Sequence, residues 1–145
     1  MTIHELQRRW KQIDLNKAAA SIVAEHKKDI ADLNREQLMD GVNKEGKKLR
    51  KYRNPKYAAR KNRMNPIPGL GNPDLYLTGR FQEAMNVKLN SKVSFEIYST
   101  DSKAPKLTKQ YGKEIFGLTD QSKDTAAHEI VNPGLIQHIK DVTKL

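Results

Sequence analysis

The residues best able to do chemistry in this chain are cations gathered between positions 44 and 63. Ten of its 27 Lys and Arg residues lie there against one acidic residue, Glu45, whereas the other 125 residues carry 17 basic and 16 acidic side chains. This stretch therefore accounts for nearly all of the net charge of +10. Such asymmetry indicates a local patch that meets a polyanion or an acidic neighbour, and a merely solvated loop is the alternative. The ten cations are Lys44, Lys47, Lys48, Arg50, Lys51, Arg53, Lys56, Arg60, Lys61 and Arg63.

Two tyrosines, Tyr52 and Tyr57, are interleaved with these cations. Lys and Arg can neutralise phosphates while aromatic rings stack on bases, so the stretch could bind nucleic acid. No zinc-finger, recognition-helix or ribonucleoprotein motif accompanies it. The pattern supports non-specific contact with a polyanion at most.

The sequence offers no catalytic constellation. There is no Cys, and the four histidines at positions 4, 26, 128 and 138 lack the spacing of a metal site. The Gly69-Leu-Gly71 segment lacks the third glycine of a dinucleotide fingerprint and follows prolines rather than a strand. We therefore expect no enzyme activity, no catalytic residues, no metal ligands and no cofactor.

Length and composition set further limits. A chain of 145 residues fits one domain, and 37% hydrophobic residues allow only a modest core. Chains of this kind often complete their burial by assembling with copies of themselves or with neighbours. No apolar run has the length of a signal peptide or a membrane span, so we expect a soluble protein without an export signal.

The elements that must position the basic stretch begin with a helical segment over residues 1–40. Thr2 and Glu5 form a capping-box pattern before an amphipathic helix that runs to Ile13. A break near residues 14–16 precedes a second apolar stripe from Leu15 to Leu33, with His26 as a packing residue. Asn34 is expected to cap a short turn that follows.

Residues 41–75 are predicted to form a basic arm. Gly41–Gly46 is typical of a tight reversal, and a helical turn or two is expected around Ala58. Residues 65–75 contain three Pro and two Gly, which exclude regular structure. The arm is therefore expected to combine the basic stretch with a long Pro/Gly-rich loop.

Residues 76–145 are predicted to be a compact α+β portion. A short helix opens at Leu77–Phe81 and buries Phe81, and two antiparallel strands follow around a turn at residues 90–92. A helix from Pro105 is expected to end at Gly117, and Thr119 to cap the next one. Pro133-Gly134 is expected to break that helix before a last helical segment. The fold class predicted is α+β, a small antiparallel sheet flanked by helices, with a single domain overall.

The order of these features, over roughly residues 30–145, resembles the neck and tail-completion proteins of tailed bacteriophages. That group includes virion-morphogenesis proteins of Mu-like phages, and the closest similarity is to proteins of Bacteroidales phages, including the crAss-like phages. Two short motifs carry the resemblance, and the charge density of the basic arm departs from it. The motif positions are Leu77, Thr78, Gly79, Phe81, Phe116, Gly117, Leu118 and Thr119.

The resemblance implies a non-enzymatic virion protein that forms a homo-oligomeric ring of 12 or 6 copies at the head–tail junction. Such a ring joins the portal or connector to the tail and lets the genome pass, with possible non-specific contact to packaged DNA and none to membrane. The expected location is the virion, and the host cytoplasm during assembly. In this interpretation Leu77–Leu145 makes the ring and Gly41–Pro73 reaches a neighbour.

Two other functions stay open. A small basic nucleic-acid-binding module of the cell would use the same basic stretch and would be a monomer. A small hydrolase or nuclease would need a catalytic set that the sequence does not contain.

Overall fold

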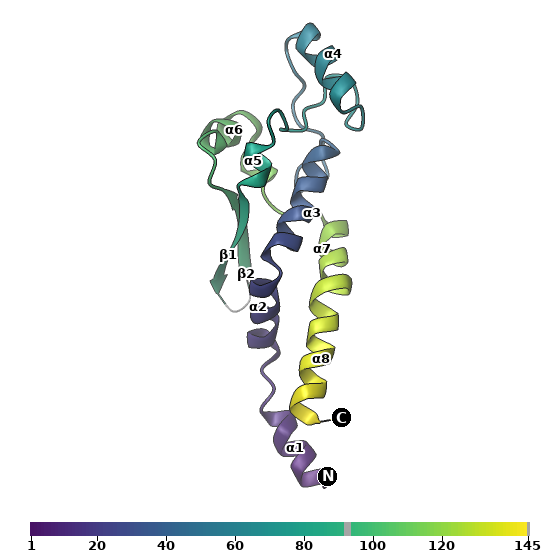
Figure 1. Cartoon of the computed structure of the whole chain (residues 1–145), viewed down its shortest axis with the longest axis vertical. Coiled ribbons are helices and arrows are strands. Elements are labelled where there is room, and N and C mark those ends of the chain that lie inside the picture. Colours follow the sequence, from purple (N-terminus) through teal and green to yellow (C-terminus); the bar gives the residue numbers. More distant parts are fainter. Residues whose placement is uncertain (92–93, 145) are drawn as a thin grey trace.

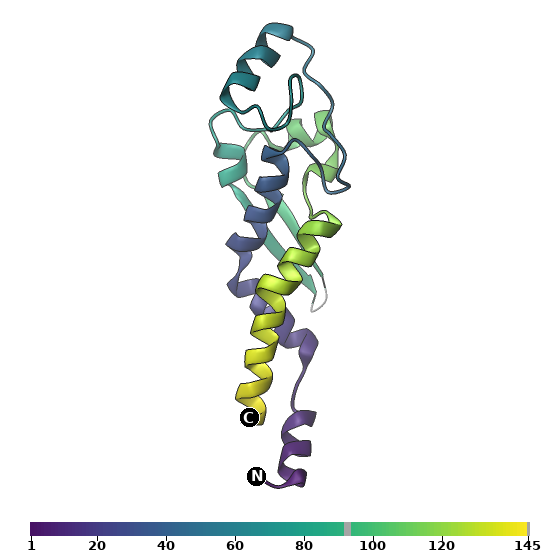
Figure 2. The same cartoon turned by 90° about the vertical axis from the view of Figure 1, so that its right-hand side faces the viewer.

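The computed structural model describes residues 1–91 and 94–144, and it is an elongated α+β molecule (Figures 1 and 2). The predicted fold class is confirmed. The elements in chain order are α1 (Ile3–Lys11), α2 (Leu15–Glu25), α3 (Lys27–Met39), α4 (Pro55–Met64), α5 (Arg80–Glu83), β1 (Met85–Ser91), β2 (Ser94–Ser99), α6 (Ala104–Tyr111), the 3₁₀ turn η1 (Lys113–Ile115), α7 (Asp120–Ala126), the π turn η2 (Ala127–Val131) and α8 (Asn132–Thr143).

The first helices begin where their capping residues predict. The Thr2 side chain accepts a hydrogen bond from the Glu5 backbone N–H, and the Glu5 carboxylate accepts one from the Thr2 backbone N–H, so the capping box is complete. The Asp14 carboxylate caps α2 by accepting a hydrogen bond from the Lys17 backbone N–H. The second stripe was predicted as continuous, but the backbone leaves helical geometry at His26, which separates α2 from α3.

The middle of the molecule has three layers. α2 and α3 run along its axis, with the β1–β2 hairpin on one side and the α7–η2–α8 helix on the other (Figure 1). α8 packs against α2 and reaches α1 at the lower end, while α4 lies at the opposite end. The basic stretch is thus held far from the N-terminal helix.

The hairpin follows the alternation of its sequence. Val87 pairs with Ile97 and Leu89 with Phe95, and this apolar face belongs to the same core as α3. Lys88 and Glu96 face solvent opposite each other. The predicted strand pair is therefore confirmed, although Asn90 belongs to β1 and the predicted turn residue Lys92, like Val93, lies outside the described residues.

The predicted break at Pro133-Gly134 is wrong. The chain continues from α7 through the π turn into α8, and Pro133 falls in the first turn of α8, where a missing N–H is tolerated. Gly134 is needed for another reason. A Cβ added there would lie 2.7 Å from Ile22 Cδ1 and 2.9 Å from Ile22 Cγ1, so the glycine lets α8 approach α2 closely.

The predicted helix from Pro105 ends earlier than expected. Gly112, with φ of 92°, terminates α6, and Gly117 lies instead in an extended segment after η1. Ile115, spaced as if it continued the helical stripe, reaches the core from η1. Ile115 is buried as its spacing predicted, but Gly112, whose φ is positive, ends the helix before Ile115 is reached.

The core lies where α3, the hairpin and the segment after α6 meet. Its most buried side chains are Ile30, Leu38, Val87 and Ile115. Phe81, predicted as buried, is part of the same cluster. This core is small, as the composition predicted, and it stops short of α1, which contains no buried residue.

Candidate functional site

The two motifs that carry the family resemblance meet in space. The Phe81 and Phe116 rings lie 5.7 Å apart between centroids, although the residues come from different motifs. Gly79 adopts φ of 85° before α5, and a Cβ there would lie 2.9 Å from the Tyr76 hydroxyl oxygen. Gly79, Phe81 and Phe116 therefore have structural roles, because they fix α5 against the segment after η1.

Buried amides on α3 hold the second motif. Asn34 Nδ2 donates to the Ile115 carbonyl at 3.0 Å, and its Oδ1 accepts from the Gly117 N–H at 2.8 Å. One turn later, Gln37 donates to the Gly117 carbonyl at 2.8 Å and accepts from the Thr119 N–H at 2.9 Å. The prediction that Asn34 caps a turn is wrong, because the residue lies inside α3 and pairs with a buried non-helical segment.

The predicted arm is folded on itself beyond the C-terminal end of α3 (Figure 1). Lys61 on α4 forms an ion pair of 2.8 Å with Asp74, and each of these side chains is about 5% exposed or less. Lys61 also donates to the Tyr76 carbonyl, while Asp74 accepts from Asn65 Nδ2 at 3.1 Å and from the Tyr76 N–H at 3.0 Å. Because both charged groups have hydrogen-bond partners as well as each other, this buried charge pair anchors the Pro/Gly loop to α4.

The arm also caps the end of α3. Lys48 Nζ donates to the Asp40 carbonyl and to the Pro68 carbonyl, at 3.0 Å each. Asn65 Nδ2 donates to the Met39 carbonyl at 3.0 Å. The last carbonyls of a helix need such donors, so these contacts stabilise α3 and the arm together.

The ten basic residues therefore do different things. Lys61 is buried, Lys48 is bound to carbonyls, and Lys47 forms an exposed ion pair of 3.4 Å with Glu45. The Lys44 side chain passes over Gly117, where a Cβ would lie 2.8 Å from Lys44 Cδ. Basic residues that are close together in the sequence thus lie in several distinct environments.

Three of the ten form an exposed stripe on α4. Lys56, Arg60 and Arg63 recur at four- and three-residue spacing, which places them on one face of the helix. None of them forms an ion pair within residues 1–91 and 94–144. We call these three residues the α4 stripe.

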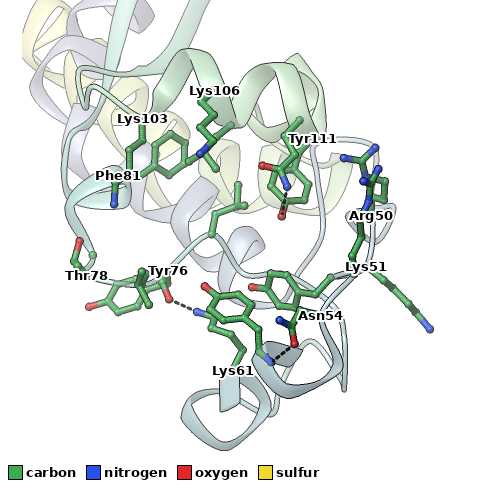
Figure 3. A pocket seen from close by; sticks show the side chains of 18 residues that line it. Arg50, Lys51, Asn54, Lys61, Tyr76, Thr78, Phe81, Lys103, Lys106 and Tyr111 are labelled. Atoms are coloured by element: carbon green, nitrogen blue, oxygen red, sulfur yellow. Dashed lines mark hydrogen bonds between the residues drawn. The ribbon is translucent and has the colours of Figure 1, made fainter. Parts of the chain in front are cut away.

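A groove opens beside α4, and four of the ten line it, including Lys61. It has a volume of about 650 Å³ and lies between residues 50–54, α4, the segment 75–81 and α6 (Figure 3). Arg50, Lys51 and Arg53 belong to the segment 50–54, Lys103 is the N-cap residue of α6, and Lys106 lies on α6. All five are exposed, and none has a carboxylate partner in the described part of the chain. Lys61, the fourth of the ten, is already paired with Asp74.

Tyrosines and aliphatic side chains form the floor of the groove. The Tyr52 and Tyr57 rings meet edge to face, with centroids 5.0 Å apart, and Tyr111 from α6 lies on another side. Burial, and then the charge of Asp74, raises the pKa of Tyr52 well above its ordinary value. Burial also raises the pKa of Tyr111, against the opposing effect of Arg50. Both phenols are therefore neutral at physiological pH.

The sequence did not identify the α6 side of this groove. Lys103, Lys106, Leu107 and Tyr111 recur at helical spacing, and that periodicity was the one available signal. Nothing in the sequence places this helix beside residues 50–54. The structure brings the two segments together through α5 and the loop before it.

No metal site or membrane span is found within the described residues. No group of three or more His, Asp or Glu side chains there could hold a metal ion, and His26 pairs with Asp29 at 3.0 Å. No helix of that part is long and apolar enough to cross a bilayer.

Comparisons with known proteins do not identify a relative of this chain. A scan against protein-family models and searches of curated proteins and solved structures found no match to this chain.

Proposed function

We propose that this chain is a structural subunit of a ring at the head–tail junction of a tailed bacteriophage, without enzymatic activity. The observation that carries the proposal is the uncovered apolar face of α1. Ile3 is 75% exposed and Trp10 is 57% exposed. A helix of nine residues is marginal in water unless its apolar face packs against something, so another chain is expected to cover it.

The opposite end of the molecule supports the same proposal. In the Pro/Gly loop, Ile67 is 67% exposed and Leu70 is 64% exposed, although the loop itself is anchored through Asp74. An elongated subunit with uncovered apolar residues at both ends can contact two different neighbours (Figure 1). The family resemblance supplies the kind of assembly, with a portal or connector on one side and a tail protein on the other.

Within a ring, neighbouring copies would meet through two different patches of each subunit. The α4 stripe then has two possible roles. It faces the lumen and balances DNA phosphate, or it pairs with acidic surfaces on adjacent ring proteins. Both roles use its unpaired cations, and an experiment on assembled rings separates them.

The first test is the mass of the protein in solution, measured by light scattering alone and with candidate neck neighbours. A closed ring of six or twelve copies, alone or on a partner, is expected. The variant Trp10→Glu should abolish this assembly, whereas Arg8→Gln, which makes the same change in net charge at an exposed position on the opposite side of α1, should not. A persistent monomer with every partner would overturn the proposal.

A second test asks what the α4 stripe contacts. Reversal of all three charges to Glu should lower the log–log salt slope of DNA binding by assembled rings by about 0.9 per lost phosphate contact if the stripe faces the lumen. An unchanged slope would exclude the lumen role and favour acidic neighbouring proteins.

A second candidate function is a nucleic-acid-binding module, which the exposed cations of the α4 stripe and of the groove favour. Such a protein would be a monomer that binds RNA or DNA alone. Tight, salt-sensitive binding by a monomer that ignores neck proteins would favour it over the ring.

A further inference from the structure

The groove beside α4 has a recognition chemistry that ring assembly does not require. Its rims carry five exposed cations without carboxylate partners in the described residues, and they belong to two segments on different sides of the opening (Figure 3). Arg50, Lys51 and Arg53 lie before α4, whereas Lys103 is the N-cap residue of α6 and Lys106 lies on that helix. Like charges held together in this way repel one another until an anion lies between them.

The floor adds a second requirement. Leu75, Leu77 and Leu107 line it together with the tyrosine rings. Leu77 is 48% exposed, so apolar surface remains uncovered at this position. A ligand that is only anionic would leave this surface in water. The groove therefore suits a ligand with an apolar group between negative charges.

The charged side chains of the groove match an anionic partner. The Asn54 side-chain oxygen already accepts hydrogen bonds from the Lys56 and Tyr57 backbones, at 2.9 and 3.2 Å. The five exposed cations can only donate hydrogen bonds, and carboxylates can only accept them, so carboxylates match these side chains.

We propose that the groove binds a short acidic peptide segment of another protein, in which a large apolar side chain is flanked by Asp or Glu. The apolar side chain packs on the floor against Leu77, Leu107 and the neighbouring tyrosines. The flanking carboxylates pair with Arg50 and Arg53 on one side and with Lys103 and Lys106 on the other. This binding does not depend on ring formation, because residues of a single copy of the chain form the whole groove.

The test is fluorescence anisotropy with the full-length protein and a labelled peptide in which Glu alternates with Leu and Phe. Lys103→Glu with Lys106→Glu should weaken binding about tenfold or more, since two charge pairs become repulsive. The matched control is Lys109→Glu with Lys113→Glu, which makes the same charge change at exposed positions outside the groove, and its affinity should change by less than about twofold.

The floor is tested with Leu77→Ser and with a second peptide in which Ser replaces Leu and Phe. Both changes should weaken binding, because the apolar contact is lost. Equal affinity for the apolar and Ser peptides would overturn the proposal, as would equal loss in the two double variants. Failure of the protein to bind either peptide would overturn it as well.

A labelled oligothymidylate distinguishes the other class of ligand. The oligonucleotide should bind more weakly than the acidic peptide and should be insensitive to Leu77→Ser. If instead it binds more tightly and is lost on reversal of Lys103 and Lys106, the groove is a single-strand nucleic-acid site and the peptide proposal is wrong. Ring formation measured on the same samples shows separately whether the proposed function holds.

Discussion

At the residue scale, the Lys61–Asp74 pair determines whether the basic arm has a fixed structure. Both charges are almost fully buried, Lys61 also donates to the Tyr76 carbonyl, and Asp74 also accepts from Asn65 and from the Tyr76 N–H. A buried pair of this kind contributes little compared with apolar side chains of equal size, but the loss of one partner leaves an uncompensated charge. The arm is therefore sensitive to single changes at this point.

We expect Lys61→Met to destabilise the protein by about 3–5 kcal/mol, because Asp74 would remain buried without its counter-ion. Arg60→Met, at the exposed neighbouring position, should change stability by about 0.5 kcal/mol or less. Urea denaturation measures both. Similar midpoints for the two variants would show that the pair is not buried in solution.

The raised pKa of Tyr52 predicts a loss of stability in alkali. The folded protein retains the phenol proton more tightly than the unfolded chain, whose pKa is about 10. This contribution is fully present below pH of about 10 and is lost as the pH rises toward the higher folded-state pKa. Tyr52→Phe should lose less stability above that pH than the parent protein, whereas Tyr98→Phe should follow the parent. Denaturation midpoints at several alkaline pH values decide between these outcomes.

At the scale of elements, the spacing of α2 and α8 is set by Gly134. The Ile22 side chain occupies the space where a Cβ would lie, and its β-branched atoms have little freedom to move. Gly in a helix normally costs stability relative to Ala, so packing against Ile22 provides a reason for glycine here. The contact also explains why one helix passes through a sequence that looked like a break.

We expect Gly134→Ala to destabilise the protein by about 1–3 kcal/mol, despite the higher helix propensity of Ala. In an Ile22→Val background, which removes Cδ1, the same substitution should cost less. Thermal or urea denaturation of the four proteins gives the coupling between the two positions. Additive effects would contradict close approach of these two helices.

At the scale of the whole molecule, the elongated shape separates two exposed apolar surfaces. α1 exposes Ile3 and Trp10 at one end, and the Pro/Gly loop exposes Ile67 and Leu70 near the other. The core that links them belongs to α3, the hairpin and the segment after η1. Neither surface contributes to that core, so each can change without unfolding the protein.

We expect the two ends to bind different neighbours. Trp10→Glu should remove one interaction and leave the other intact, and Leu70→Ser should do the reverse. Light scattering of each variant with each candidate neck protein measures this, and circular dichroism confirms that both variants fold. Loss of the same partner in both variants would show that the two ends serve one interface.

The sequence alone determined the elements whose signals are local. Thr2 and Thr119 cap helices because a side-chain oxygen and a nearby backbone N–H lie within a few residues. The strands follow their two-residue alternation, and the prolines and glycines of residues 65–75 exclude regular structure. These properties depend on neighbours along the chain, so the α+β class could be predicted.

Only the tertiary structure decided which distant residues meet. The sequence predicted that Asn34 caps a turn, but its side chain forms hydrogen bonds with the Ile115 and Gly117 backbones. Lys61 was one of ten basic residues in the sequence, and only the structure shows its ion pair with Asp74. The groove joins residues 50–54 to α6, fifty positions later in the chain. Burial of a polar group is decided by what lies opposite it in space, and no local pattern in the sequence contains that information.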